Sequence, residues 1–240
     1  MPRRKLETVT LLGIDCLDLD RLVLAMDICQ RELEFAEVKI LTSLESSRKE
    51  VVKIDPINST EGYSKFVLSE LDKYVNTSHV LIVQYDGFVL NTSKWTDEFL
   101  KYDYIGAPWL VADWSVKGFD FPEELLGKLV VGNGGFSLRS KKMTSLCAKI
   151  FREGGFPRFH PEDTAIGVYS RKLLEDSGIN FAPTKLAKQF SFEYRDDKDS
   201  RWNGQFGFHG LRWTDISNWL EKNPEYVVDM ENGAIKVVKK

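Results

Sequence analysis

The sequence predicts a single Rossmann-like α/β domain, with a mostly parallel central sheet flanked by helices. One observation is the apolar run at residues 79–83 (HVLIV), whose length and β-branched content are typical of a strand buried on both faces. A second is a β-α-β start, with strand-like residues 8–14 and 37–42 on either side of a helix-patterned segment at 19–33. The length of 240 residues suits one such domain, and 42% hydrophobic residues supply its core.

The rest of the chain continues to alternate between strands and helices. Before the buried run we expect a short strand at residues 51–57 and a helix at 63–75. After it we expect helices at 96–102, 141–151 and 160–174, with strand segments at 103–109 and 129–140. Residues 113–127 are rich in aromatic residues, glycine and proline and are predicted to form a surface loop. The C-terminal part should hold short strands, a helix at 214–220 and a final short strand.

Composition excludes several classes of protein. The net charge is −3 and the basic residues are dispersed, which argues against a nucleic-acid-binding protein. The three cysteines follow no metal-binding or disulfide spacing, and this favours a reducing compartment. No apolar run approaches the roughly 20 residues that a membrane-spanning helix needs. We therefore expect a cytoplasmic protein without a membrane span.

The buried run at 79–83 ends in the motif QYDGF, where Asp86 stands beside Gly87. Ligands of open α/β sheets bind outside the carboxyl ends of the strands. An acidic residue at that position, next to a glycine, is suited to hold a metal ion or a sugar hydroxyl. Asp-Gly is also a common turn dipeptide, so a plain tight turn remains an equal alternative.

A second motif, GNGGFSLRS, places Asn133, Gly134 and Gly135 directly before a predicted strand. Glycines there permit positive φ and allow the backbone to approach a ligand. The motif is not a dinucleotide fingerprint, because it precedes a strand and does not open a helix. A glycine-rich bulge or turn is the competing interpretation. Arg139 is a candidate phosphate ligand, although an exposed arginine at a strand end is commoner.

Two further motifs supply candidate catalytic groups. In HPED, Glu162 and Asp163 begin a predicted helix, where acids often serve only as caps; Asp163 is also placed to act as a general base. In FGFHG, His209 is either a core histidine or a metal ligand that complements Asp86, a pairing that suits manganese. The chain contains no Ser-His-Asp order, P-loop or zinc spacing.

Taken in order, QYDGF, YDYIGAPW, GNGGFSLRS, PED and FGFHG resemble the motifs of nucleotide-sugar glycosyltransferases of the GT-A fold. They are most similar to a family of uncharacterised proteins that are classed as glycosyltransferases by resemblance. The resemblance covers residues 9–210 and is most specific over 84–163. It implies one GT-A domain over residues 1–240, with a nucleotide-binding half at about 6–105, an acceptor and catalytic half at about 106–222 and a tail at 223–240.

The resemblance also implies roles for individual residues. In GT-A enzymes an acidic motif after a central strand holds a divalent metal on the donor diphosphate. Gln84 and Asp86 stand at these positions here, so only the second acid is present. His209 matches a late metal-binding histidine, and a Mn or Mg ion is expected at Asp86 and His209. Asp163, beside Glu162, matches the base that activates the acceptor. The donor-binding residues so implied are Asp15, Ser43, Gln84, Tyr85, Asp86, Gly87, Asn133, Gly134, Gly135 and Arg139.

The resemblance implies that the protein transfers a sugar, with inversion, from a nucleotide-diphosphate sugar to a glycan or another hydroxyl compound. The donor that it favours is a UDP-sugar. Two alternatives remain open. Gln84 in place of an acid leaves room for a catalytically silent module that binds nucleotide sugars or carbohydrates. Clustered carboxylates would also suit a metal-dependent nucleotidyltransferase or hydrolase.

Overall fold

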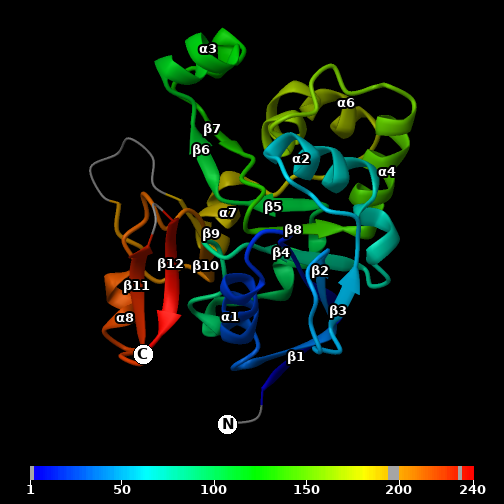
Figure 1. Ribbon diagram of the computed structural model, residues 1–240. Coiled ribbons are helices and arrows are strands. Elements are labelled where there is room, and N and C mark those ends of the chain that lie inside the picture. Colours follow the sequence, from blue (N-terminus) through cyan, green and yellow to red (C-terminus); the bar gives the residue numbers. More distant parts are fainter. Residues whose placement is uncertain (1–2, 194–199, 232–233) are drawn as a thin grey trace.

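The computed structural model describes residues 3–193, 200–231 and 234–240 and confirms the α/β class (Figure 1). A six-stranded sheet in the order β3-β2-β1-β4-β8-β5 forms its centre. The strands are β1 (Arg4–Ile14), β2 (Leu33–Thr42), β3 (Val51–Lys53), β4 (His79–Val83), β5 (Tyr104–Gly106) and β8 (Ser137–Ser140). Only β8 runs antiparallel to its neighbours, so the sheet is mixed but mostly parallel.

The predicted central strand is β4, and all five of its residues are buried. Because side chains alternate along a strand, β4 sends Leu81 and Val83 to one face of the sheet and Val80 and Ile82 to the other. Helix α1 (Leu19–Cys29) packs against the first face, and α2 (Thr60–Ser69) packs against the second, where α4 (Lys141–Arg152) lies beside it. An Asp or Ser side chain caps the first turn of each helix: Asp18, Ser59 and Ser140.

A cluster of buried aromatic rings supports the carboxyl edge of the sheet. Phe206 lies with its ring centroid 5.3 Å from Trp95, 5.7 Å from Phe190 and 5.9 Å from Phe136. The cluster joins α7 (Thr184–Phe190), β9 (Ser191–Phe192) and β10 (Gly207–Phe208) to the segment that follows β4, where Val89 pairs with Gly207. These packed rings hold QYDGF and FGFHG side by side.

The prediction of a surface loop at residues 113–127 is wrong. Antiparallel strands β6 (Pro108–Leu110) and β7 (Leu129–Val131) form an arm that projects from the sheet and carries α3 (Asp113–Phe119) and the 3-10 turn η4 (Glu123–Leu125) at its end (Figure 1). The arm is ordered because its apolar residues bury one another in a small separate core of Val111, Phe121, Val130 and Val168. Only the last of these lies outside the arm.

Other elements differ in their ends or their type. The helix predicted at 63–75 divides into α2 and the 3-10 turn η1 (Leu71–Tyr74), and the one at 96–102 is a 3-10 turn, η3 (Asp97–Lys101), which follows η2 (Thr92–Lys94). The helix at 160–174 consists of α5 (Glu162–Thr164), a π turn η5 (Ala165–Tyr169) and α6 (Arg171–Asp176).

The C-terminal region holds α8 (Ser217–Leu220) and an antiparallel pair, β11 (Tyr226–Glu231) and β12 (Ala234–Lys239), where a single strand was predicted. Strand β12 contacts α1, and Trp219 packs its ring 5.3 Å from Tyr226 and 6.2 Å from Phe88. Among the described residues, no helix is long and apolar enough to cross a bilayer.

We expect Phe206→Ala to reduce the free energy of unfolding by about 3–5 kcal/mol, because it removes a fully buried ring and leaves a cavity. Phe119→Ala is the matched control; that ring is 43% exposed, so its removal should cost much less. Chemical denaturation followed by circular dichroism measures both values. Equal losses in the two variants would contradict the assignment of Phe206 to the core.

Candidate functional site

Residues 84–87 form a tight turn at the carboxyl end of β4. Gln84 and Gly87 exchange two backbone hydrogen bonds of 3.0 and 3.1 Å, so Asp-Gly does lie in a tight turn, which leaves the role of the Asp86 side chain open. The backbone carbonyl of Asp86 accepts a hydrogen bond of 2.8 Å from Gly210. The turn is therefore fixed to FGFHG, and it directs the side chains of Gln84 and Asp86 toward His209.

His209 joins this turn to a second group of polar residues. Its Nε2 lies 3.1 Å from Gln84 Oε1 and 3.8 Å from Asp86 Oδ1, while its Nδ1 lies 3.0 Å from Glu193 Oε1. Burial lowers the pKa of His209, but the carboxylates of Asp86 and Glu193 outweigh burial and raise the pKa to about 9. The surrounding carboxylates therefore favour the protonated form of the His209 imidazole.

Glu193 is a site residue that the sequence analysis missed. Its Oε2 accepts hydrogen bonds from Trp109 Nε1 (2.8 Å) and Asn133 Nδ2 (2.9 Å). The oxygen of the same Asn133 amide group, Oδ1, accepts a hydrogen bond of 3.1 Å from the backbone N–H of Phe136. A glutamate in a short strand-end segment carries no motif of its own. Trp109 was visible in YDYIGAPW, but nothing in the sequence linked it to Glu193.

The glycines of GNGGFSLRS make room for side chains of the protein itself. A Cβ atom on Gly135 would lie 2.0 Å from His209 Nε2, and one on Gly134 would lie 2.4 Å from Glu162 Oε1. Neither glycine adopts a positive φ. These residues, like the buried Asn133, therefore leave room for side chains that form the site.

Arg139 and Glu162 form a buried ion pair below the glycine loop. The Arg139 Nη2 to Glu162 Oε1 distance is 3.2 Å, and the two side chains are only 2% and 8% exposed. Arg139 also donates to Ser137 Oγ at 3.0 Å. The expectation of a strand-end arginine that binds a donor phosphate is wrong, because the guanidinium is enclosed by protein. Glu162 neutralises this cation, so we assign it to positioning and leave Asp163 as the candidate base.

Asp163 follows Glu162 at the start of α5 and reaches a cavity. Its Oδ1 accepts a hydrogen bond of 2.7 Å from the backbone of Thr164. Burial raises the pKa of Asp163 from 3.8 to about 8, and the nearby carboxylates of Glu162 and Glu193 add to the rise. A carboxylate with this pKa can exchange a proton with a bound hydroxyl near neutral pH.

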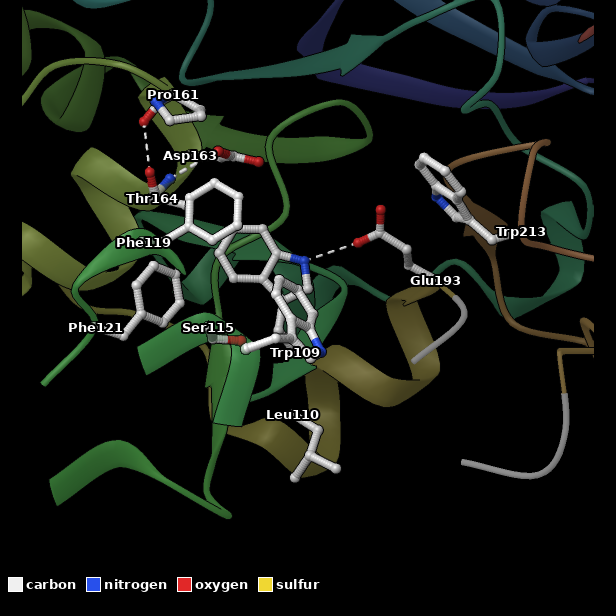
Figure 2. A pocket seen from close by; sticks show the side chains of 11 residues that line it. Trp109, Leu110, Ser115, Phe119, Phe121, Pro161, Asp163, Thr164, Glu193 and Trp213 are labelled. Atoms are coloured by element: carbon white, nitrogen blue, oxygen red, sulfur yellow. Dashed lines mark hydrogen bonds between the residues drawn. The ribbon is translucent and has the colours of Figure 1, made fainter. Parts of the chain in front are cut away.

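The cavity has a volume of about 510 Å³ and lies beside Asp163 (Figure 2). Figure 2 shows Asp163 and Glu193 at two sides of it, with Phe119 and Phe121 away from Trp213. Five of its eleven lining residues are aromatic, and the walls come from the arm, the start of α5, Glu193 and the residues after FGFHG. The lining residues are Trp109, Leu110, Trp114, Ser115, Phe119, Phe121, Pro161, Asp163, Thr164, Glu193 and Trp213.

Asp15 and Ser43 lie at the same edge of the sheet as Gln84, because parallel β1, β2 and β4 all end there. Asp15 accepts hydrogen bonds from two backbone groups of its own loop and pairs with Arg21 at 2.7 Å. The Arg21 guanidinium in turn stacks 3.9 Å from the Tyr85 ring centroid. Asp15 thus supports the turn indirectly. The carbonyl of Ser43 accepts a bond from Lys53 at 3.3 Å.

Two side chains fit the expected metal ion. Within the part of the chain that the structure describes, no three His, Cys, Asp or Glu residues gather around one point. Asp86 Oδ1 is nevertheless buried with no hydrogen-bond partner among the described residues, and it faces His209 Nε2 with Gln84 Oε1 nearby. An imidazole nitrogen with a carboxylate oxygen suits a borderline divalent ion whose other ligands are oxygens of a bound molecule.

Comparison with known proteins gives one family match. A family model described as "Protein of unknown function (DUF5672)" matches residues 47–209, which include Asp86, Asp163, Glu193 and His209. No curated protein matches the chain. A similar solved structure is the bifunctional IspDF from Campylobacter jejuni, with 10% identity and a TM-score of 0.38 over 72% of this chain and 48% of that one. The chain thus spans about half of that protein, and so distant a likeness carries no functional argument.

The raised pKa of Asp163 predicts how stability depends on pH. An ordinary aspartate in the unfolded chain loses its proton near 3.8, whereas folded Asp163 keeps it up to about 8. The folded state therefore binds more protons between these values, and this residue makes stability fall as pH rises. Asp163→Asn should become progressively more stable relative to the wild type between pH 4 and pH 8 in urea denaturation.

The control is Asp176→Asn, which makes the same chemical change in an exposed pair with Lys172 on α6. Its stability difference from the wild type should stay nearly constant over this range. A constant difference for Asp163→Asn as well would show that Asp163 does not retain its proton.

Proposed function

The chain belongs to the DUF5672 family, and we propose that it is a glycosyltransferase that moves a sugar from a nucleotide-diphosphate sugar to an acceptor hydroxyl. The observation that carries the proposal is the position of His209 between two unlike groups. One group is the strand-end turn with Asp86, and the other includes Glu193 on the wall of the cavity that Asp163 also lines. A cationic centre beside a base on a cavity is what transfer to a hydroxyl needs.

Asp163 is the proposed general base. Its carboxylate takes the proton of the acceptor hydroxyl as the acceptor oxygen bonds to the anomeric carbon, and the nucleoside diphosphate leaves from the opposite face with the electrons of the broken bond. This is an inverting reaction. Base assistance of this kind typically increases the reaction rate by about 10²–10⁴-fold. The raised pKa suits the task, because it makes the ionised carboxylate a stronger base.

Asp86 and His209 are the proposed partners of the leaving diphosphate. Asp86 Oδ1 and His209 Nε2 would hold Mn or Mg, which supplies Lewis-acid stabilisation of negative charge when bound. His209 must release its Nε2 proton to act as a ligand, so ion binding competes with protons. Glu193 accepts from Nδ1 and keeps the other nitrogen directed at Asp86. Without an ion, protonated His209 itself supplies one positive charge.

The GT-A arrangement is part of this proposal, as are a UDP-sugar donor and a glycan or other hydroxyl acceptor. Its support is the motif order together with a mostly parallel sheet whose carboxyl edge holds Asp15, Ser43 and the turn with Gln84. The same edge receives the glycine loop, because β8 runs antiparallel to β4.

A catalytically silent sugar-binding module is the second candidate. Gln84 stands at the position of the expected first acid, and the aromatic cavity suits sugar binding without any reaction. A two-metal nucleotidyltransferase or hydrolase has less support. Such sites need clustered carboxylates, and Glu162 is already paired with Arg139.

Asp163→Asn tests the proposed base. Turnover of a nucleotide-diphosphate sugar should fall by about 10²–10⁴-fold because the amide cannot take a proton, whereas donor affinity should stay unchanged. Nucleotide release is measured with a mixture of acceptors, and Asp176→Asn serves as the active control. A kcat for Asp163→Asn equal to that of the wild type would remove Asp163 from the reaction. Donor binding without turnover in the wild type would favour the silent module.

Asp86→Ala tests the donor site. Wild-type protein should be stabilised against heat by a nucleotide-diphosphate sugar, and more so with Mn, because a ligand that binds only the folded state raises its apparent stability. Asp86→Ala should lose the manganese-dependent part of this shift. Nucleoside triphosphates are included as probes, and a preference for them would favour nucleotidyl transfer. Unchanged shifts in the variant, with and without Mn, would exclude Asp86 from donor binding.

A further inference from the structure

We propose that Tyr63 and Ser64, consecutive residues near the start of α2, are positioning residues that hold the two halves of the site against each other. The hydroxyl of Tyr63 holds the amide of Gln84 on the donor side. The hydroxyl of Ser64 holds the backbone just before Asp163 on the base side. The inference rests on the proposed function, because it explains how the base of that reaction is kept in register with the partners of the diphosphate.

The start of α2 is fixed independently of the site. The Ser59 side chain caps the helix by accepting a hydrogen bond of 3.0 Å from the backbone N–H of Gly62. The ring of Tyr63 packs against the core on the second face of the sheet, and Ser64 is only 1% exposed. Because successive residues of a helix point about 100° apart, these two neighbours reach different groups.

Tyr63 acts on the side of the strand-end turn. Its hydroxyl accepts a hydrogen bond of 3.1 Å from Gln84 Nε2, and the Oε1 of the same amide lies 3.1 Å from His209 Nε2. The amide is therefore held through both its nitrogen and its oxygen. An unrestrained amide turns readily about its last torsion and can present either atom to a neighbour. Tyr63 thus determines which atom of Gln84 faces His209.

Ser64 acts on the side of the base. Its Oγ accepts a hydrogen bond of 3.1 Å from the backbone N–H of Glu162 and lies 2.9 Å from His160 Nδ1. The Glu162 side chain pairs with Arg139, so residue 162 is held through both its backbone and its side chain. Asp163 is the next residue in the chain. The direction of its side chain therefore depends on the contact that Ser64 makes.

The glycine loop contacts the same two groups from another part of the chain. A Cβ atom on Gly134 would lie 2.4 Å from Glu162 Oε1, and one on Gly135 would lie 2.8 Å from Gln84 Oε1. Two consecutive residues of α2 and two consecutive residues of this loop thus each reach both halves of the site. The separation between Asp163 and the turn is therefore set by two independent contacts.

The test separates the two halves by their kinetic constants. Nucleotide release by the full chain is measured with UDP-glucose, UDP-galactose and UDP-N-acetylglucosamine and a mixture of acceptors, and the donor that the wild type consumes fastest is used for the variants. Tyr63→Phe keeps the ring and removes the hydroxyl. We expect it to raise the donor KM about tenfold and to leave kcat nearly unchanged, because a hydrogen bond that orders the donor side is lost.

Ser64→Ala should give the opposite result. We expect kcat to fall by about 10²-fold and the donor KM to stay nearly unchanged, because the base is displaced while the donor side is intact. Thermal unfolding shows whether the variant is folded. Ser64→Cys, which replaces the hydroxyl with a weak hydrogen-bond acceptor, is the second variant if Ser64→Ala does not fold.

The controls make the same chemical changes away from these contacts. Tyr74→Phe removes the hydroxyl of a tyrosine that stacks on Phe66 in the same core, and Ser69→Ala removes a buried hydroxyl at the end of α2. Both should keep the wild-type kcat and KM. Stabilisation against heat by the chosen UDP-sugar measures the donor side without turnover; Tyr63→Phe should reduce it and Ser64→Ala should retain it.

The possible failures are distinguishable. A wild type that releases nucleotide, together with variants that keep its constants or change kcat and KM in parallel, would overturn the inference and leave the glycosyltransferase in place. Absence of nucleotide release by the wild type with every donor would refute the proposed function, and the inference would fall with it.

Discussion

The candidate site depends on a single imidazole that is held from both ends. His209 faces Gln84 and Asp86 through one nitrogen and Glu193 through the other, and these residues come from separate parts of the chain. Because the ring is rigid, its two contacts fix the distance between the strand-end turn and the cavity wall. Gly135 and Gly87 leave the space that the ring fills. The acidic residues around His209 balance its charge, so the same residues fix both the position and the charge of the ring.

The antiparallel strand β8 extends this arrangement to the rest of the sheet. Its direction brings the loop before Ser137 to the edge where β4 ends, which a parallel strand in the same place would not do. At that loop, Arg139 on β8 pairs with Glu162 in an enclosed contact. Removing either partner would leave the other charge buried without compensation, so the two residues depend on each other. Asp163 follows Glu162 in the chain, so the contact between Arg139 and Glu162 also fixes the position of Asp163.

The parts predicted well from sequence are those that local pattern determines. β4 was predicted with its observed ends because its four consecutive apolar residues after His79 are typical of a strand buried on both faces, and Asp86, Asp163 and His209 were singled out as candidates because each stands in a recognisable motif. The arm was misjudged because its small core forms only when its own ends meet and Val168 joins them. Glu193 was missed, and the packing of the glycines against His209 and Glu162 was not foreseen, because these partners are distant in sequence and visible only in three dimensions.

The arm has a consequence for how such a protein can diversify. It supplies Trp109, Trp114 and two phenylalanines to one side of the cavity, yet its own core depends little on the sheet. Exchange of residues 110–128 would reshape what the cavity accepts while the turn, His209 and Asp163 stay as they are. Under the proposed function, recognition and chemistry would lie in separable stretches of one chain. Family members with different arms would then share one reaction and differ in the molecules they accept.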